Sequence, residues 1–129
     1  MSNIKEVHNK RMQYAYDSVK GFIESHKEDG KEYRSLARSF PALIKANGLG
    51  AAVLYLKGRE EKNAHHALYR RLNEWYGKKD GKQVARDFEL YCKIPCMSSE
   101  EYRIFTREVL ELSIWIKRFA EGMITSELQ

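Results

Sequence analysis

The sequence predicts an all-α protein, folded as a single compact bundle of about six helices over residues 1–129 with a long C-terminal helix. Apolar residues recur at intervals of three and four, as on one face of an α-helix, and no segment sustains the period of two that is typical of strands. Only two prolines and eight glycines interrupt this pattern, and 43% of the residues are hydrophobic. A chain of 129 residues with this composition can fill one core, and it leaves little room for a second.

Two helices and a shorter third are expected before residue 48. A long amphipathic helix starts near the N-terminus and ends in the polar stretch Lys27–Gly30. The next helix starts near Lys31, and we expect Pro41 to break it, because proline lacks an N–H and restrains the residue before it. A short helix from Pro41 then ends at Asn47-Gly48, which is typical of a left-handed helix stop.

The middle of the chain predicts three further elements. Leu49–Lys57 is apolar on nearly every side, which predicts a helix enclosed by the core. An amphipathic helix follows over Glu61–Tyr76, and Gly77–Gly81 then indicates a flexible basic turn. A short helix is expected over Lys82–Tyr91.

The last helix has a clear start and a long apolar seam. Ser98 and Glu101 have the spacing of a capping box, in which each residue satisfies a backbone N–H at the helix start. The apolar positions then follow in steps of three and four: Tyr102, Phe105, Val109, Leu112, Ile116, Phe119 and Met123. Further apolar residues beside this seam make the surface wider than one helix can cover. We expect this helix either to be central to the bundle or to share its surface with another subunit.

The positive charge lies in the middle of the chain. The formal net charge is +5, and residues 31–80 carry eleven basic against five acidic side chains, a balance of +6. Arg34 and Arg38 are four residues apart and share a helix face, and Lys45 follows seven residues later, beyond the expected break at Pro41. Spaced cations of this kind suit a sugar-phosphate backbone and predict binding that does not depend on sequence. The alternative is an ordinary solvated face with weak ion pairs.

Membrane and metal sites are not expected. The longest apolar run, Leu49–Leu56, is far shorter than the roughly 20 residues that cross a bilayer, and the first residues lack the apolar core of a signal peptide, so we expect a cytoplasmic protein. Cys92 and Cys96 should then be reduced thiols. With His65 and His66 they form the one conceivable metal set, and the spacing does not match a zinc site.

The sequence also lacks the motifs of common enzymes. It contains no phosphate-binding glycine loop, no Gly-x-Ser-x-Gly elbow, no zinc-binding His-Glu-x-x-His helix and no dense set of aspartates for magnesium. We therefore expect no catalytic residue, no cofactor and no small-molecule substrate. One enzymatic alternative is a metal-free ribonuclease that would use histidines as acid and base and an arginine for phosphate charge. Its candidate residues are His8, His26, His65, His66, Arg70 and Arg71.

Three segments resemble a known family in the same order along the chain. The stretch Tyr33–Leu49, with the apolar run Ala52–Leu56 behind it, is similar to the small-subunit family of the Cmr (type III-B) CRISPR effector complex. Thr106–Leu110 and Trp115–Ala120 resemble that family's closing helix, and Gln13–Tyr16 resembles its opening helix. None of these segments is a catalytic signature, and together they cover much of the chain.

The resemblance implies a non-catalytic structural subunit that serves in antiviral defence. Members of the family stack in a short filament beside the crRNA-bearing subunits and help to line the groove for target RNA. The partners implied are the other Cmr effector subunits, copies of the chain itself and the backbone of the crRNA/target RNA duplex. The basic residues inside the matching segments are candidates for RNA or subunit contact: Arg34, Arg38, Lys45, Arg107, Lys117 and Arg118. A free-standing helical adaptor that binds only protein stays an alternative.

Overall fold

Helices joined by short loops make up the described structure, which confirms the predicted fold class. It is a computed structural model that describes residues 3–79 and 88–125. The α-helices are α1 (Asn3–Ser25), α2 (Gly30–Asn47), α3 (Leu49–Lys57), α4 (Asn63–Lys79), α5 (Leu90–Lys93) and α6 (Ser99–Met123), and the short 3₁₀ turns are η1 (Lys27–Asp29) and η2 (Ile94–Cys96). No strand occurs within the described ranges. No helix in these ranges is long and apolar enough to span a bilayer.

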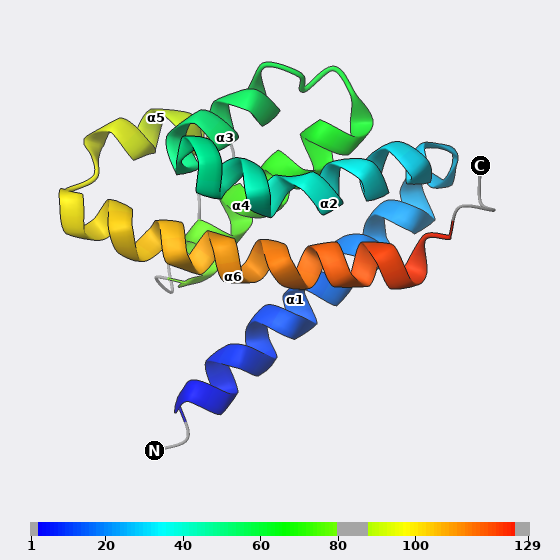
Figure 1. The fold of residues 1–129 in the computed structure, drawn as a ribbon, viewed down its shortest axis with the longest axis horizontal. Helices are drawn as coiled ribbons and strands as arrows, with labels where there is room; N and C mark the ends of the chain where they lie inside the picture. Colours follow the sequence, from blue (N-terminus) through cyan, green and yellow to red (C-terminus); the bar gives the residue numbers. More distant parts are fainter. Residues whose placement is uncertain (1–2, 80–87, 126–129) are drawn as a thin grey trace.

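Helix α6 runs along the bundle and packs mainly against α1 and α2 (Figure 1). The middle of its predicted seam is buried, and the outer positions Tyr102, Phe119 and Met123 are half-buried. The buried residues of α6 include Phe105, Val109, Leu112, Ile116 and Ala120. Two partner helices therefore cover the buried part of its wide apolar surface, and sharing of the remaining surface with another subunit stays a prediction.

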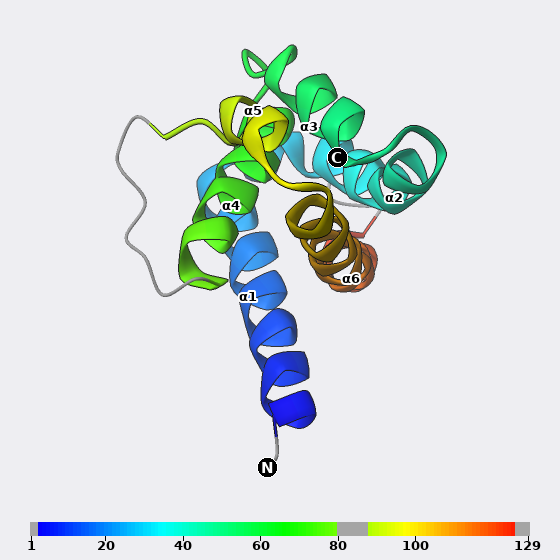
Figure 2. The same ribbon diagram turned by 90° about the vertical axis from the view of Figure 1, so that its left-hand side faces the viewer.

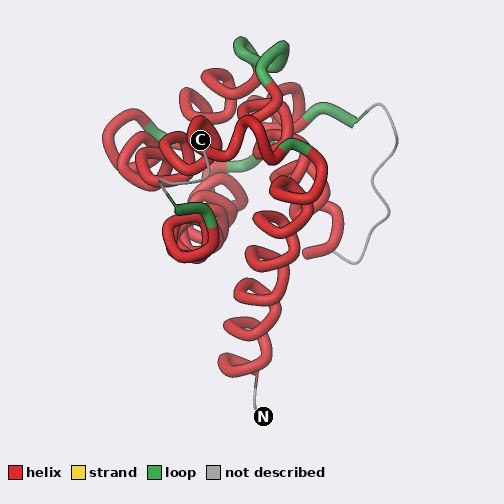
Figure 3. Tube along the Cα trace, turned by 90° about the vertical axis from the view of Figure 1, so that its right-hand side faces the viewer, coloured by secondary structure: helices red, strands yellow, loops and turns green. Residues whose placement is uncertain are grey.

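Helix α1 is anchored to the bundle by its second half. Ala15, Val19 and Phe22 are buried, and the N-terminal turns extend beyond the other helices (Figures 1 and 2). Arg11 ties this helix to α6, because its guanidinium lies 2.9 Å from a carboxylate oxygen of Glu108. Figure 3, a view from the opposite end, shows the same projection of α1 from the body of the bundle.

Helix α2 continues through Pro41, so the predicted break is wrong. Phe40 and Pro41 are both buried in the middle of the helix, and Ile44 continues the buried face one turn later. A proline inside a helix removes one backbone hydrogen bond and costs about 3 kcal/mol. Burial of aromatic and aliphatic side chains on one continuous face offsets that cost. The helix ends as predicted at Gly48, whose φ is +90°.

Helix α3 has the predicted bounds, but the core does not surround it on all sides as predicted. Leu49, Ala52, Val53 and Leu56 are buried on one side. Leu54, on the other side, is 55% exposed. A helix of nine residues at the edge of a small bundle is covered from one direction only, so its apolar outer face stays in contact with solvent.

The segment after α4 also differs from the prediction. Helix α4 continues through Gly77 to Lys79, where a flexible turn was expected, and the rest of that turn lies outside the described residues. Of the helix expected over residues 82–91, residues 82–87 are not described, Phe88 and Glu89 are not helical, and helix begins only at Leu90.

Contacts with α4 explain this course. Phe88 stacks on Tyr76 with ring centroids 5.5 Å apart, and the Tyr69 hydroxyl donates to Glu89 over 2.7 Å. The Leu90 N–H donates to Asn73 Oδ1 over 3.1 Å. The hydrogen bond to Asn73 satisfies the Leu90 N–H in place of a helical backbone bond, and the contacts of Phe88 and Glu89 hold this segment against α4.

The start of α6 confirms half of the predicted capping box. The Ser98 hydroxyl accepts a hydrogen bond from the Glu101 N–H over 3.0 Å. The Glu101 carboxylate instead accepts from the Tyr76 hydroxyl over 3.3 Å, so it links α6 to α4.

Candidate nucleic-acid interface

The continuous helix α2 aligns three of the predicted cations. Arg34, Arg38 and Lys45 are separated by four and seven residues, which correspond to about one and two turns of an α-helix. Because Pro41 does not break the helix, Lys45 lies on the same face as the two arginines. The sequence alone did not show on which face Lys45 lies relative to the two arginines. The structure puts it in line with them along α2.

Helix α6 runs antiparallel beside α2 and presents its own row of charged residues. Arg103, Arg107, Lys117 and Glu121 follow one another at helical spacing along one face. The Arg38 Nε atom lies 3.2 Å from a Glu121 carboxylate oxygen. At the other end of this helix pair the Gly50 N–H, in the first turn of α3, donates to the Tyr102 hydroxyl of α6. The two rows therefore meet where α2 and α6 lie side by side, and Figure 1 shows the course of these two helices.

Two hollows follow this junction. One, of about 360 Å³, is lined by Ser35, Arg38 and Ser39 of α2 and by Lys117 and Glu121 of α6. The other, of about 520 Å³, has Lys45 of α2 on one side and α6 residues on the other. Those α6 residues are Arg103, Ile104, Thr106, Arg107, Leu110, Glu111 and Ile114. We call the cations that line the two hollows, Arg38, Lys45, Arg103, Arg107 and Lys117, the α2–α6 seam.

Most of the positive charge in the α2–α6 seam is not neutralised by a neighbour. Among the described residues, Arg38 is the one seam cation with an ion pair, and its side chain is 56% exposed. An exposed pair of this kind contributes little, so an anionic ligand can replace Glu121 as the partner of Arg38. Glu111, the second carboxylate in the hollows, pairs with Arg11 over 3.3 Å. The seam thus offers several donors to an incoming anion.

The other two predicted contact residues lie differently. The Arg34 side chain is half-buried, and its Nε atom is enclosed without a hydrogen-bond partner among the described residues. The Arg118 guanidinium lies 5.7 Å from the centroid of Trp115, and that ring contacts His8 of α1 at 5.2 Å. Arg34 therefore extends the α2 row, whereas Arg118 lies on the flank of α6 that faces α1 and outside the seam.

Arg103 belongs to the α2–α6 seam although the sequence did not single it out as a contact residue. Its spacing of four residues from Arg107 was the available signal, because it puts both guanidinium groups on one face of α6. The sequence alone could not show that this face adjoins α2.

Two basic residues of α4, Arg71 and Lys78, have structural partners instead. Arg71 donates to the Asp17 carbonyl over 3.4 Å and pairs with Glu74 at 3.8 Å. Arg71 and Lys78 also lie over the ring of Tyr14, at 5.6 and 5.0 Å from its centroid. These cations join α4 to α1, so they do not extend the seam.

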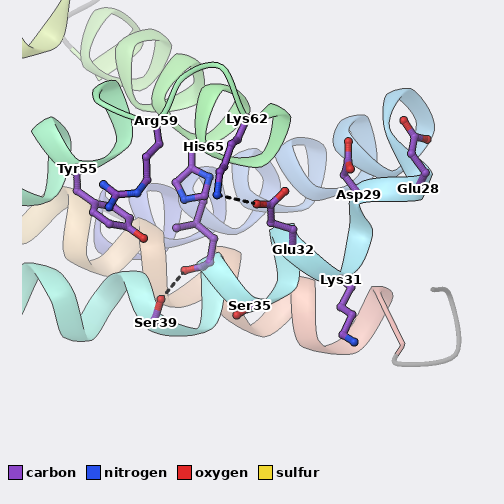
Figure 4. A pocket seen from close by; sticks show the side chains of 11 residues that line it. Glu28, Asp29, Lys31, Glu32, Ser35, Ser39, Tyr55, Arg59, Lys62 and His65 are labelled. Carbon is purple, nitrogen blue, oxygen red and sulfur yellow. Dashed lines mark hydrogen bonds and ion pairs between the residues drawn. The ribbon is translucent and has the colours of Figure 1, made fainter.

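A third hollow, of about 610 Å³, lies on the opposite flank of α2 (Figure 4). We call it the α2–α4 pocket. The Arg59 guanidinium lies 4.1 Å from the centroid of Tyr55, and Lys62 lies 3.8 Å from the Glu32 carboxylate. Burial lowers the pKa of His65, which is 6% exposed. The remaining lining residues of the pocket are Glu28, Asp29, Lys31, Ser35, Leu36 and Ser39.

The four candidate histidines lie in different surroundings, and one of them, His26, lines a hollow of about 270 Å³ together with Arg70 and Arg71. His8 contacts Trp115, and His26 contacts Phe22. The other two, His65 and His66, contact Tyr55 and Glu60, so each of the four has a different partner.

A group of potential metal ligands does occur, but not the one considered from the sequence. Ligand atoms of His26, Glu28 and Asp29 lie within 4.8 Å of one another at the turn between α1 and α2. No second feature of this turn points to an ion. Cys92 and Cys96 are exposed free thiols and are not part of this group.

Comparison with known proteins gives one consistent result. A family model described as "CRISPR-associated protein (Cas_Cmr5)" matches residues 7–123. The curated protein "CRISPR system Cmr subunit Cmr5" of Thermus thermophilus is 35% identical over 116 residues, which cover 87% of this chain and 90% of that protein. The X-ray structure of a CRISPR-associated Cmr5 family protein from Thermus thermophilus has a TM-score of 0.73 and 30% identity. The match covers 92% of this chain and 97% of that one.

Proposed function

The chain belongs to the CRISPR-associated Cmr5 family, and on this premise we propose that it is a non-catalytic small subunit of a type III-B Cmr effector complex. In this role it acts in the cytoplasm, as one helical domain, in antiviral defence. It joins other Cmr subunits and contacts the backbone of the crRNA/target RNA duplex without reading its sequence. The α2–α6 seam is the observation that carries the RNA part of the proposal.

The chemistry of the α2–α6 seam suits an RNA backbone. Lys45, Arg103, Arg107 and Lys117 form no ion pair with another described residue, and Arg38 pairs only with the partly exposed Glu121. Lysine and arginine side chains bind phosphates and release counterions, which gives an affinity that falls steeply with salt. Contacts with phosphates carry no information about base sequence, so the affinity should be nearly the same for unrelated sequences.

Stacking of copies is the second part of the proposal. Leu54 on α3 and Ile104 on α6 are 55% and 45% exposed, and α1 projects from the bundle (Figure 2). Apolar side chains at the surface favour contact with a neighbour over contact with water. Sedimentation velocity at increasing protein concentration should show association. A strict monomer that also fails to bind backbone subunits would contradict this part of the proposal.

Salt-dependent RNA binding tests the role of the α2–α6 seam. We expect fluorescence anisotropy with two unrelated single-stranded RNAs to give similar affinities that fall between about 50 and about 200 mM salt. Replacing Lys45, Arg107 and Lys117 by glutamine should weaken binding to both RNAs alike. The triple variant should also have a smaller slope in a plot of the logarithm of the association constant against the logarithm of the salt concentration. The slope should fall by about one for each phosphate that is no longer bound.

The matched control removes the same charge elsewhere. Lys5, Lys10 and Lys20 are exposed on α1, so their replacement by glutamine lowers the net charge by the same amount without touching the seam. We expect this control to keep most of the salt slope. Equal losses of affinity in both triple variants would show that net charge alone, and not the seam, accounts for binding.

A further inference from the structure

The α2–α4 pocket holds a buried polar atom that the fold leaves without a partner. His65 is 6% exposed, and its Nδ1 atom is enclosed with no hydrogen bond to any described residue. Buried polar atoms in folded proteins nearly always have a hydrogen-bond partner, and an exception needs an explanation. The imidazole lies between the side chains of Arg59 and Lys62 at the wall of the pocket (Figure 4). A ligand in the pocket would supply the missing partner.

The two ends of the α2–α4 pocket have opposite charge. At one end the Arg59 guanidinium lies on the Tyr55 ring, 4.1 Å from its centroid, and has no ion pair with a described carboxylate. At the other end lie the carboxylates of Glu28 and Asp29 (Figure 4). A guanidinium binds phosphate, and carboxylates accept hydrogen bonds from hydroxyl and amino groups. This combination matches a nucleotide, which carries a phosphate together with ribose hydroxyls and base edges.

The pocket adjoins the α2–α6 seam. Ser35 and Ser39 are exposed on α2 and line both this pocket and the hollow that contains Arg38 and Lys117. The two hollows therefore lie on either side of this exposed turn of α2. A strand that follows the seam can cross this turn and place one nucleotide in the pocket, whose volume of about 610 Å³ lies within the usual range of ligand sites.

We propose that the α2–α4 pocket binds one unstacked nucleotide of the RNA strand that follows the α2–α6 seam. Arg59 holds a phosphate of this nucleotide, and His65 Nδ1 makes a hydrogen bond to it when the long side chains of Arg59 and Lys62 move from the imidazole onto the ligand. The inference rests on the proposed function, because the seam delivers the strand.

Imidazole signals in ¹H–¹³C NMR spectra test the pocket directly. The single variants His8→Gln, His26→Gln and His66→Gln each identify one signal in the wild-type spectrum, and the remaining signal is that of His65. We expect adenosine 5′-monophosphate and a short single-stranded RNA each to shift the His65 signal in a saturable manner, while the signal of His8, which lies on α1, does not move. An equal shift with inorganic phosphate would overturn the nucleotide assignment in favour of a simple anion site. No shift with the RNA would overturn the proposal.

A substitution with a matched control completes the test. Arg59 is exposed, so Arg59→Gln should fold normally and weaken adenosine 5′-monophosphate binding by at least about tenfold, whereas Lys10→Gln should not change it. Equal binding by Arg59→Gln and wild type would overturn the role of Arg59. If RNA binds through the seam but His65 does not respond, the pocket inference fails and the proposed function stands. If RNA does not bind at all, both fail.

Discussion

A single hydroxyl fixes the start of the longest helix. Ser98 Oγ accepts the Glu101 N–H, one of the N-terminal amides that α6 itself cannot satisfy. We expect Ser98→Ala to lower the free energy of unfolding by about 1 kcal/mol, measured by urea denaturation followed by circular dichroism. Ser99 is exposed and lies inside the helix, so Ser99→Ala should have a smaller effect. Equal losses of stability in the two variants would contradict the capping role.

Buried tyrosine hydroxyls make the fold less stable at alkaline pH. Burial, together with the hydrogen bond to Glu89, raises the pKa of Tyr69 from 10.0 to about 12. Burial also raises the pKa values of Tyr14 and Tyr33 above the usual range. The folded chain thus holds these protons more tightly than the unfolded chain. Their contribution to stability is complete below about pH 10 and is lost as the pH rises through the folded pKa values.

Urea denaturation at increasing alkaline pH checks this loss of stability. We expect the free energy of unfolding to decrease between about pH 10 and about pH 11, because the unfolded chain releases tyrosine protons first. Tyr69→Phe removes one of the groups and should make this decrease smaller. A free energy of unfolding that does not change over this pH interval would contradict the raised pKa values of the buried tyrosines.

At the scale of elements, the α2–α3 junction depends on one glycine. Gly48 has φ +90° and ψ 161°, a backbone region that residues with a Cβ rarely adopt. Gly48→Ala should therefore lower the free energy of unfolding by about 1–3 kcal/mol. Gly122 lies inside α6, and a Cβ added there would have nothing within 4 Å, so Gly122→Ala should be neutral or stabilising by up to about 1 kcal/mol.

Thermal unfolding of the two alanine variants gives a direct comparison. The substitution is expected to destabilise the protein at Gly48 and not at Gly122, because one glycine is required by its backbone angles and the other is not. Destabilisation of similar size at both positions would contradict this account of the junction.

Local patterns predicted the elements well, and contacts between distant residues explain the exceptions. The bounds of α3 and the stops at Gly48 and Gly58 follow from residues next to one another in the sequence. The continuity of α2 through Pro41 could not be predicted, because it depends on burial of that residue by other helices. The non-helical backbone at Phe88 likewise depends on contact with Tyr76, twelve residues earlier in the chain.

At the scale of the whole molecule, the candidate interface combines helices that are far apart in the sequence. Helical spacing predicted that Arg34 and Arg38 share a face, and family resemblance selected Arg107 and Lys117. Neither could show that Lys117 lies across a hollow from Arg38 or that Arg118 lies on the other flank of α6. Such neighbours depend on the packing of α2 against α6, which local sequence does not encode.

The family itself was predictable from the sequence because its segments recur in order. The resemblance quoted for Tyr33–Leu49 and for the two ends of the chain agrees with a family match over residues 7–123. The unpartnered His65 Nδ1 was not predictable, since a lone histidine in an amphipathic helix gives no sign of what surrounds it. Only the neighbouring α2 and the turn after α3 reveal the pocket.

Target RNA binding by the assembled complex tests the central claim most directly. The chain is co-expressed with the other Cmr subunits and a guide RNA, the complex is purified through a tag on another subunit, and its affinity for target RNA is measured. We expect the wild-type chain to co-elute with guide RNA and partners. The Lys45→Gln, Arg107→Gln, Lys117→Gln triple variant should also co-elute, but its complex should bind target RNA more weakly than that of the α1 control. A chain that elutes apart from the complex, or a seam variant with unchanged affinity, would contradict the account.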